Sequence, residues 1–310
     1  MPKLDRQMME DLSAKTRFQV DVIEKVYRLA ELLRKINEIY ILNENMVLKG
    51  GTSINFLYFD IPRLSIDIDF DYIGSVKQDQ MKKDRTQIDT ILPRLFKQLG
   101  YNMKSYKPYA LLQYHLGYVN SAGNLDRIKV EINFFNRTPL FTTEKRTFYN
   151  PFDINNFIVR TLPIEDLFSR KLRALMTRST ARDLYDAYQL FNNKIPFKND
   201  VLKKCFIFYL CCNKDPRKIK IDILDEITES DIKTNLLPLL RKGEKITAIE
   251  MKKIVIPMIS EFLDFSESEL EFITKMFDER IYNPNVLFQG IKYNSAVKQH
   301  PGISWRMKNL

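Results

Sequence analysis

The sequence predicts an α+β fold, in which a region of mixed helices and strands is followed by a helical region. Apolar residues recur at helical spacing over residues 4–40, polar and apolar residues alternate over residues 63–72, and helical patterning dominates from Pro196 onward. A chain of 310 residues, of which 45% are hydrophobic, can fill two cores. We therefore expect two domains, residues 1–195 and residues 196–310.

Local patterns predict the elements in order. Residues 4–40 form two helices with a break near residues 15–17. The segment MVLKGG is a strand that ends in glycines, and Thr52 is placed to cap the helix that follows. Alternation, turn residues and helix stops then predict strands over 63–72, 103–119 and 125–136, and helices over 79–99, from 164 and from about 181.

The charge balance is basic, with 49 Lys and Arg residues against 39 Asp and Glu residues and a net charge of +10. This balance favours a polyanionic partner such as a nucleotide, a nucleic acid or an anionic membrane. A soluble protein of lysine-rich composition is the alternative, because no dense run of Lys and Arg marks a tail.

Composition also restricts the compartment and the kind of metal site. No stretch approaches the ~20 apolar residues of a membrane span, and the segment MPKLDRQMMEDLSAK is charged throughout, unlike a signal peptide. We therefore expect a cytoplasmic protein without membrane contact. Cys205, Cys211 and Cys212 lie in an apolar run and are expected to be buried thiols. With only two histidines, a zinc site is not expected.

The segment RLSIDIDFDY places three carboxylates on one face of a strand. Because side chains alternate, Asp67, Asp69 and Asp71 oppose the apolar face of Ile68 and Phe70. Carboxylates this close repel one another unless water or a cation neutralises them, and Mg²⁺ takes hard oxygen ligands of this kind. A solvated edge strand is the alternative for these residues alone.

The residues just before this strand suggest a phosphate site. Gly50, Gly51 and Thr52 join a strand to a helix, which leaves backbone N–H groups open to a phosphate chain. A tight turn without a ligand has the same pattern, but a glycine turn followed by paired carboxylates is much more specific than either part.

These residues resemble the Gly-Gly-Ser/Thr and Asp-x-Asp signature of the DNA polymerase β-like nucleotidyltransferase superfamily, and LKGGTSINFLY with RLSIDIDF is similar to the AbiEii/AbiGii toxin family. The resemblance implies a nucleotidyltransferase core, a mixed β-sheet flanked by helices, followed by a C-terminal helical bundle. It implies Asp67 and Asp69 as metal ligands of a site that can hold two Mg²⁺ ions. It also implies nucleotide-binding residues, namely Gly50, Gly51, Thr52, Arg63 and Ser65. Asp71 lies beyond the signature and is interpreted as structural or solvated.

A second motif follows in the segment RKLRALMTR and, further on, ARDLYDAY. Lys171 projects from the apolar stripe of its helix, so it either reaches water along its stem or meets an anionic partner. Arg170, Arg173 and Arg178 fall off the stripe and are interpreted as solvated, and Arg182 with Asp186 is interpreted as a helical ion pair. The segments are similar to the downstream motif of the same family, which implies active-site roles for Lys171 and Asp183.

Glu131 lies in the predicted strand IKVEINFF, on the face opposite to its apolar neighbours. In the superfamily a third carboxylate commonly comes from a later strand, so Glu131 is the candidate third metal ligand. An exposed glutamate without a ligand, on a half-buried strand, explains the position of Glu131 equally well.

The resemblance implies transfer of a nucleoside monophosphate from an NTP to an acceptor hydroxyl, by the toxin of a type IV toxin–antitoxin or abortive-infection system. RNA, and tRNA in particular, is the expected acceptor, and the antitoxin need not touch the toxin. A small-molecule nucleotidyltransferase of the antibiotic-modifying kind and a non-catalytic nucleotide-binding module are the alternatives. A candidate RNA-facing surface in the helical region comprises Lys203, Lys204, Lys214, Arg217, Lys218 and Lys220, with a solvated basic helix end as the default interpretation.

Overall fold

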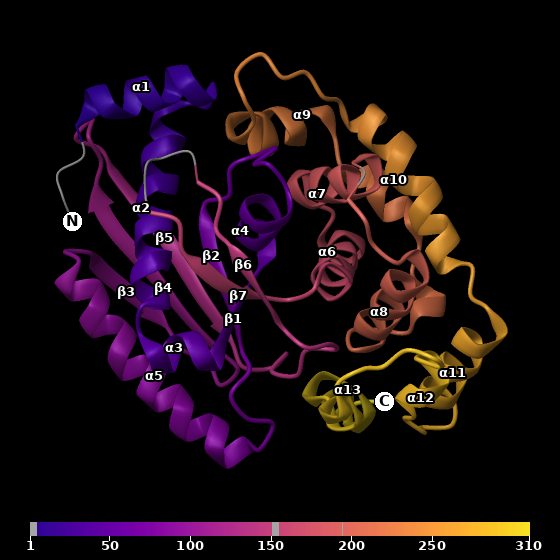
Figure 1. The fold of residues 1–310 in the computed structure, drawn as a ribbon. Helices are drawn as coiled ribbons and strands as arrows, with labels where there is room; N and C mark the ends of the chain where they lie inside the picture. The colour runs from indigo at the N-terminus through magenta and orange to yellow at the C-terminus, as the bar shows by residue number, and fades with distance from the viewer. Residues whose placement is uncertain (1–4, 151–154, 194) are drawn as a thin grey trace. The chain divides into compact units, whose positions relative to one another are not determined.

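The computed structural model describes residues 5–150, 155–193 and 195–310 and divides into two compact units (Figure 1). The sheet unit comprises Met1–Arg137, Thr143–Thr161 and Pro238–Glu244, and the helical unit comprises Thr138–Thr142, Leu162–Leu237 and Lys245–Leu310. The domain boundary expected at residue 195 stays a prediction. Contacts within the structure group the helices that follow residue 161 with the later helices, in the helical unit.

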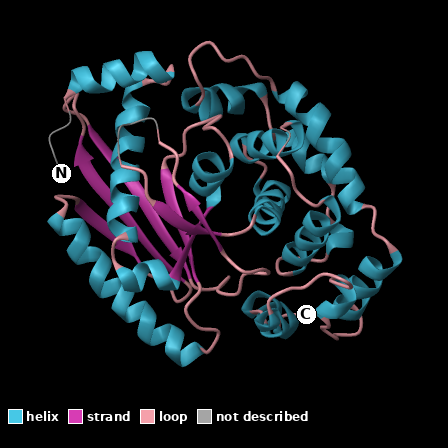
Figure 2. Cartoon of the chain, viewed as in Figure 1, coloured by secondary structure: helices cyan, strands magenta, loops and turns pink. Residues whose placement is uncertain are grey.

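The sheet unit contains a seven-stranded mixed sheet of order β3-β4-β5-β2-β1-β7-β6 (Figure 2). Its pairs β1·β7 and β2·β5 are parallel, and the other neighbours are antiparallel. The strands are β1 Met46–Lys49, β2 Asp67–Tyr72, β3 Asn102–Tyr106, β4 Leu111–Val119, β5 Leu125–Asn133, β6 Glu144–Thr147 and β7 Ile158–Thr161.

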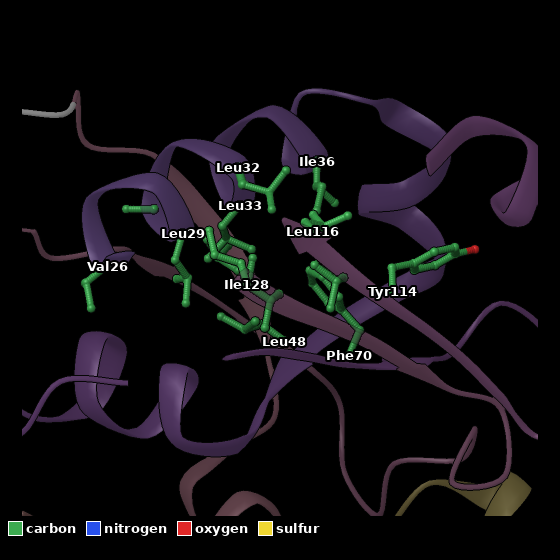
Figure 3. Packing of buried hydrophobic residues seen from close by; sticks show 14 of the residues in the cluster. Val26, Leu29, Leu32, Leu33, Ile36, Leu48, Phe70, Tyr114, Leu116 and Ile128 are labelled. Carbon is green, nitrogen blue, oxygen red and sulfur yellow. The ribbon is translucent and has the colours of Figure 1, made fainter. Parts of the chain in front are cut away.

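Helices of the sheet unit bury one face of this sheet. Leu29, Leu33 and Ile36 of α2 pack with Phe70 of β2 and Ile128 of β5 in one hydrophobic cluster (Figure 3). On the opposite face, the side chains of β4 and β5 are half-buried or exposed. More buried and more exposed side chains therefore alternate along both strands. The helices are α1 Arg6–Thr16, α2 Val20–Asn37, α3 Tyr40–Asn45, α4 Gly50–Ser53, a π-helical turn Ile54–Tyr58 and α5 Gln78–Gln98.

The helical unit is built around a second apolar cluster, which includes Phe208, Phe272 and Leu287. Cys205 and Cys211 are buried free thiols, and Cys212 is a half-buried free thiol. The α-helices are α6 Ile164–Arg178, α7 Ala181–Asn192, α8 Asn199–Cys211, α9 Glu229–Asp231, α10 Ala248–Leu263, α11 Glu267–Phe277, α12 Pro284–Leu287 and α13 Pro301–Lys308. None of the helices in the described ranges combines the length and hydropathy that a membrane span requires.

Three details differ from the sequence-based expectation. The strand expected over 103–119 is two strands, β3 and β4, and the short strands β6 and β7 were not expected. The prediction that Thr52 caps a helix is wrong, because α4 begins at Gly50 directly after β1. The left-handed backbone of Gly50, with φ of 71°, turns the chain early enough to place Thr52 inside the helix.

Candidate active site

The glycine turn lies directly against the aspartate strand of the sheet unit. A Cβ atom on Gly50 would stand 2.6 Å from Oδ2 of Asp69, and a Cβ atom on Gly51 would stand 2.6 Å from Nη2 of Arg63 and 3.0 Å from Oγ of Ser65. A larger residue at either position would force these side chains to move, and the positive φ of Gly50 also disfavours one there. The fold therefore brings the predicted phosphate turn together with three of the predicted site residues.

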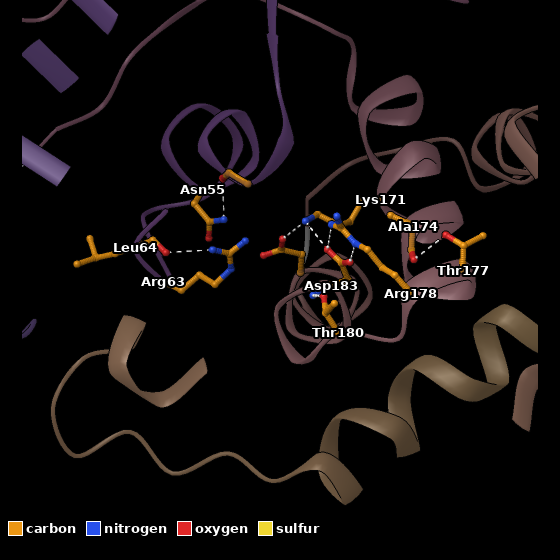
Figure 4. Close-up of polar contacts among 11 residues, drawn as sticks. Asn55, Arg63, Leu64, Lys171, Ala174, Thr177, Arg178, Thr180 and Asp183 are labelled. Atoms are coloured by element: carbon orange, nitrogen blue, oxygen red, sulfur yellow. Dashed lines mark hydrogen bonds and ion pairs between the residues drawn. The ribbon is translucent and has the colours of Figure 1, made fainter. Parts of the chain in front are cut away.

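Buried polar contacts hold this turn in place. Thr52 Oγ1 lies 3.0 Å from Ser65 Oγ and also donates to the carbonyl oxygen of Asp67. Arg63 is only 2% exposed, and its Nη1 donates to the carbonyl of Leu64 at 3.0 Å (Figure 4). The Thr52 and Ser65 side chains are likewise buried. These contacts tie β2 to the helix that follows the turn.

Asn55 is a residue of this support that the sequence reasoning missed. Its Nδ2 donates to the carbonyl of Gly51 at 2.9 Å from within the buried helical turn (Figure 4). The signal was present in the sequence, because an amide four residues after a glycine, in an otherwise apolar segment, needs a buried partner.

The parallel pairing of β2 with β5 gathers the predicted metal ligands. Asp69 lies opposite Glu131, and Asp67 lies opposite Lys129, all on the face that the helices leave open. Burial raises the pKa of Asp69 to about 6, and the nearby carboxylates of Asp67 and Glu131 act in the same direction. Lys129 and Lys49 oppose the rise in pKa. The ionised form of Asp69 is therefore disfavoured unless a cation stabilises it.

Lys129 is the second residue that the sequence reasoning missed. Its Nζ lies 2.6 Å from Oε2 of Glu131 and 3.8 Å from Oδ2 of Asp67. Burial alone would raise the pKa of Glu131, but the hydrogen bond and the charge of Lys129 outweigh it, so that pKa is lowered. The alternation of Lys129 with Glu131 in IKVEI was the available signal, since both side chains share one face.

Asp71 differs from the other two aspartates of the strand. Its side chain is fully buried, and its Oδ1 lies 2.6 Å from Nζ of Lys49 on β1. This ion pair joins the paired strands β1 and β2 behind the open end of the site. The geometry agrees with the structural interpretation of Asp71 and not with the solvated one.

The second motif forms a buried ionic cluster in the helical unit. Lys171 Nζ lies 2.7 Å from Asp183 and 2.8 Å from Asp186, and its side chain is only 9% exposed (Figure 4). Asp183 also accepts from Arg178, at 2.9 Å from Nη2. Burial alone would raise the pKa of Asp183, but Lys171 and Arg178 outweigh it and hold that pKa well below the usual range.

Local geometry explains how Asp183 reaches the preceding helix. Ser179 ends α6 in a left-handed conformation with φ of 46°, and Thr180 then caps α7 by accepting from the Asp183 N–H at 3.3 Å. This sharp turn returns the first turn of α7 to Lys171, twelve positions earlier in the sequence.

Two readings of charged residues near this motif are wrong. Asp186 pairs with Lys171, whereas the sequence suggested Arg182 as its partner. Arg170 is buried at 8% exposure, with its Nε 2.8 Å from Oδ1 of Asp166. Arg178 also bonds Asp183, but its side chain stays exposed, as expected. Helical spacing did not reveal the Lys171–Asp186 pair, because the two residues lie on different helices, whereas Asp166 lies four residues before Arg170 in α6, a spacing that permits such a pair.

The oxygen donors of the sheet unit fit a divalent cation at Asp67 and Asp69. Both carboxylates lie on one face, and burial, with a smaller contribution from Asp67 and Glu131, raises the pKa of Asp69, so a cation bound there would stabilise its ionised form. Among the described residues, no three His, Cys, Asp or Glu side chains are grouped so that they could hold a metal ion. Glu131 instead engages Lys129, so its role as a third ligand stays a prediction.

Comparisons with known proteins identify the family and the fold. The family model described as the nucleotidyl transferase AbiEii toxin of type IV toxin–antitoxin systems matches residues 31–266. MenT4, a nucleotidyltransferase toxin of Mycobacterium tuberculosis H37Rv, is similar in fold, with a TM-score of 0.65 at 16% identity over 92% of this chain and 98% of that chain. A search of curated protein sequences gives no match.

A much weaker structural likeness is to an antigenic nucleotidyltransferase-like protein from Paracoccidioides brasiliensis, with a TM-score of 0.35 at 16% identity over 66% of this chain and 97% of that chain, and no conclusion is based on it. The family match confirms the resemblance predicted from the two motifs, and the fold of MenT4 confirms the predicted α+β class. The chain therefore belongs to the AbiEii family of type IV toxin–antitoxin systems and is a nucleotidyltransferase.

Proposed function

We propose that this toxin transfers a nucleoside monophosphate from an NTP to a hydroxyl group of RNA, tRNA included, with Mg²⁺ as its metal. The observation that carries the proposal is the close packing of the glycine turn on Asp69, since a Cβ atom on Gly50 would meet that carboxylate at 2.6 Å. A phosphate held by the turn and a cation held by Asp69 would then be neighbours.

The roles of the site residues follow from this arrangement. Asp67 and Asp69 hold the metal, and backbone N–H groups of Gly50, Gly51 and Thr52 receive the β- and γ-phosphates. Mg²⁺ bound there would neutralise charge on the α-phosphate and on the departing pyrophosphate. The acceptor oxygen forms the new bond to the α-phosphorus as the bond to pyrophosphate breaks.

The remaining predicted residues divide into contacts and supports. Arg63 and Ser65 stay predicted phosphate contacts, and their burial beneath the turn gives them the further role of holding it. Lys171 neutralises charge on the triphosphate or on the leaving group. Asp183 orients Lys171, a role that the 2.7 Å contact supports over the alternative of contacting the acceptor.

Type IV family membership implies a cognate antitoxin as well as the NTP substrate. We propose that the antitoxin counters the consequences of RNA modification without binding this chain. Co-expression should restore growth, while the two purified proteins should show no association in size-exclusion chromatography. Stable co-elution would contradict this part of the proposal.

The test of the proposed function uses purified protein, total RNA and each labelled NTP in turn. Label should enter the RNA fraction with Mg²⁺, should be absent with EDTA, and should return when excess Mg²⁺ is added. Failure of both label transfer and NTP binding would refute the proposal. Label found only in a small-molecule fraction would replace RNA by a small acceptor.

Replacing Lys129 should alter metal binding measurably. In Lys129→Met, the ammonium 2.6 Å from Glu131 is gone, so Mn²⁺ should bind in the absence of NTP roughly threefold to tenfold more tightly. Titration calorimetry of the metal alone measures this change. Lys145→Met, on β6 at the far edge of the sheet, is the matched control. Equal Mn²⁺ affinity in both variants and the wild type would show that Lys129 does not compete with the metal.

A further inference from the structure

A row of side chains crosses four strands of the sheet unit and ends at the candidate metal site. Lys104 of β3 lies opposite His115 of β4, His115 lies opposite Lys129 of β5, and Lys129 lies opposite Asp67 of β2. Directly opposed residues share one face of a sheet. Because neighbouring strands are ~4.8 Å apart, the backbone of Lys104 is about 14 Å from that of Asp67.

A surface groove of about 490 Å³ lies beside this row, over β3, β4 and the start of β5. Gly117 keeps its floor open, since even a Cβ atom there would stand 3.3 Å from the carbonyl oxygen of Asn102. Arg127 lies opposite Gly117 and on the same face as Lys129. The groove is lined by Gly100, Asn102, Lys104, His115, Gly117, Tyr118, Val119, Leu125 and Arg127.

The groove is cationic and its charges are available. No carboxylate is among the described residues that line it, and both Lys104 and Arg127 are exposed. Neither side chain forms an ion pair within the described ranges. The neighbouring carboxylate of Asp126 accepts from Lys25 at 3.0 Å and so is already neutralised. A polyanion therefore meets two unneutralised cations at this surface.

Three of the six cations that could face RNA in the helical unit are already paired with carboxylates. Lys203 lies 3.0 Å from Glu269, Lys204 lies 3.5 Å from Asp200, and Arg217 lies 2.7 Å from Asp278. A phosphate would have to displace these carboxylates. At Lys104 and Arg127, in the groove of the sheet unit, a phosphate would not have to displace a paired carboxylate.

We propose that this groove binds the sugar-phosphate backbone of the RNA acceptor, a step that rests on the proposed function. Lys104 and Arg127 contact phosphates, and the row through His115 and Lys129 leads the strand toward Asp67. The exposed side chains of Leu125 and Val119 offer apolar surface to an unstacked base, which suits a single strand better than a duplex. Lysine on an edge strand can instead serve only to prevent strand pairing between molecules.

The test uses the full chain and a fluorescein-labelled single-stranded oligoribonucleotide, followed by fluorescence anisotropy at several salt concentrations. The variant K104Q/R127Q should bind it roughly tenfold or more weakly. The slope of log affinity against log salt should shrink by about 1.4, because each phosphate contact on a single strand contributes about 0.7. Binding of a fluorescent NTP should be unchanged.

The matched control is K218Q/K220Q, which removes two exposed lysines of the helical unit. Equal RNA affinity and salt slope in K104Q/R127Q and the wild type would contradict the proposal that RNA binds in the groove. Increased aggregation with unchanged RNA affinity would contradict it as well. Weaker binding in the control alone would move the RNA surface to the helical unit and overturn the groove as well. This assay needs no catalysis, so a wild type that binds RNA in the groove but neither transfers label nor binds NTP would refute only the proposed function.

Discussion

Asp69→Asn should lower nucleotidyl transfer about 10³-fold, equivalent to about 4 kcal/mol of transition-state stabilisation. The substitution keeps the size of the side chain and removes the charge that the proposed metal requires. Its amide would face the same glycine turn, because Asp69 Oδ2 lies 2.6 Å from where a Cβ on Gly50 would stand. Label transfer from NTP to RNA, measured under single-turnover conditions, checks the rate.

The stability of this variant separates a functional residue from a structural one. Because Asp69 is buried beside Asp67 and Glu131, its ionised carboxylate disfavours the folded state at neutral pH. Asp69→Asn should therefore keep or increase the Tm while it loses activity. Asp79→Asn, on the exposed first turn of α5, is the control for both measurements. A variant that keeps activity within tenfold, or that loses activity only because it unfolds, would contradict the assignment.

Lys171→Met should destabilise the protein by about 3–5 kcal/mol, because it removes the cation between two buried carboxylates. Asp183 and Asp186 are about 1% and 0% exposed, so water cannot replace the lost ammonium. We expect Tm to fall by roughly 10 °C in a thermal unfolding scan. Lys204→Met is the matched control, since its partner Asp200 is largely exposed and the pair is worth only about 0.5 kcal/mol. Equal Tm values for the two lysine variants would show that the cluster has no structural role.

Acid sensitivity provides an independent measure of the same cluster. A carboxyl whose pKa is lowered by folding stabilises the native state above its unfolded pKa of about 4, and this stabilisation is lost as the pH falls toward the folded pKa. Asp183 is such a group, since Lys171 and Arg178 outweigh its burial. Asp183→Asn should thus be less stable than wild type at pH 7 but lose less stability between pH 5 and pH 3, as measured by urea unfolding. An unchanged acid slope would contradict the lowered pKa.

The family, the α+β class and the faces of the site residues could be predicted from short segments. Asp67 and Asp69 share a face because alternation is a property of a single strand, and the glycine turn is recognisable because Gly50 adopts a backbone conformation that other residues rarely adopt. Both features depend on neighbours in the sequence, so local patterns suffice. The motif around Lys171 and Asp183 was recognised in the same way.

The partners of these residues depend on contacts that no local pattern contains. Lys129 meets Asp67 because β5 pairs in parallel with β2 across about sixty residues of chain, and a shift of one residue would turn Lys129 to the other face. Asp186 meets Lys171 because two helices pack together, which replaced the helical pair expected with Arg182. Strand register and helix packing are determined by burial of the whole core, and they decide which charges become neighbours.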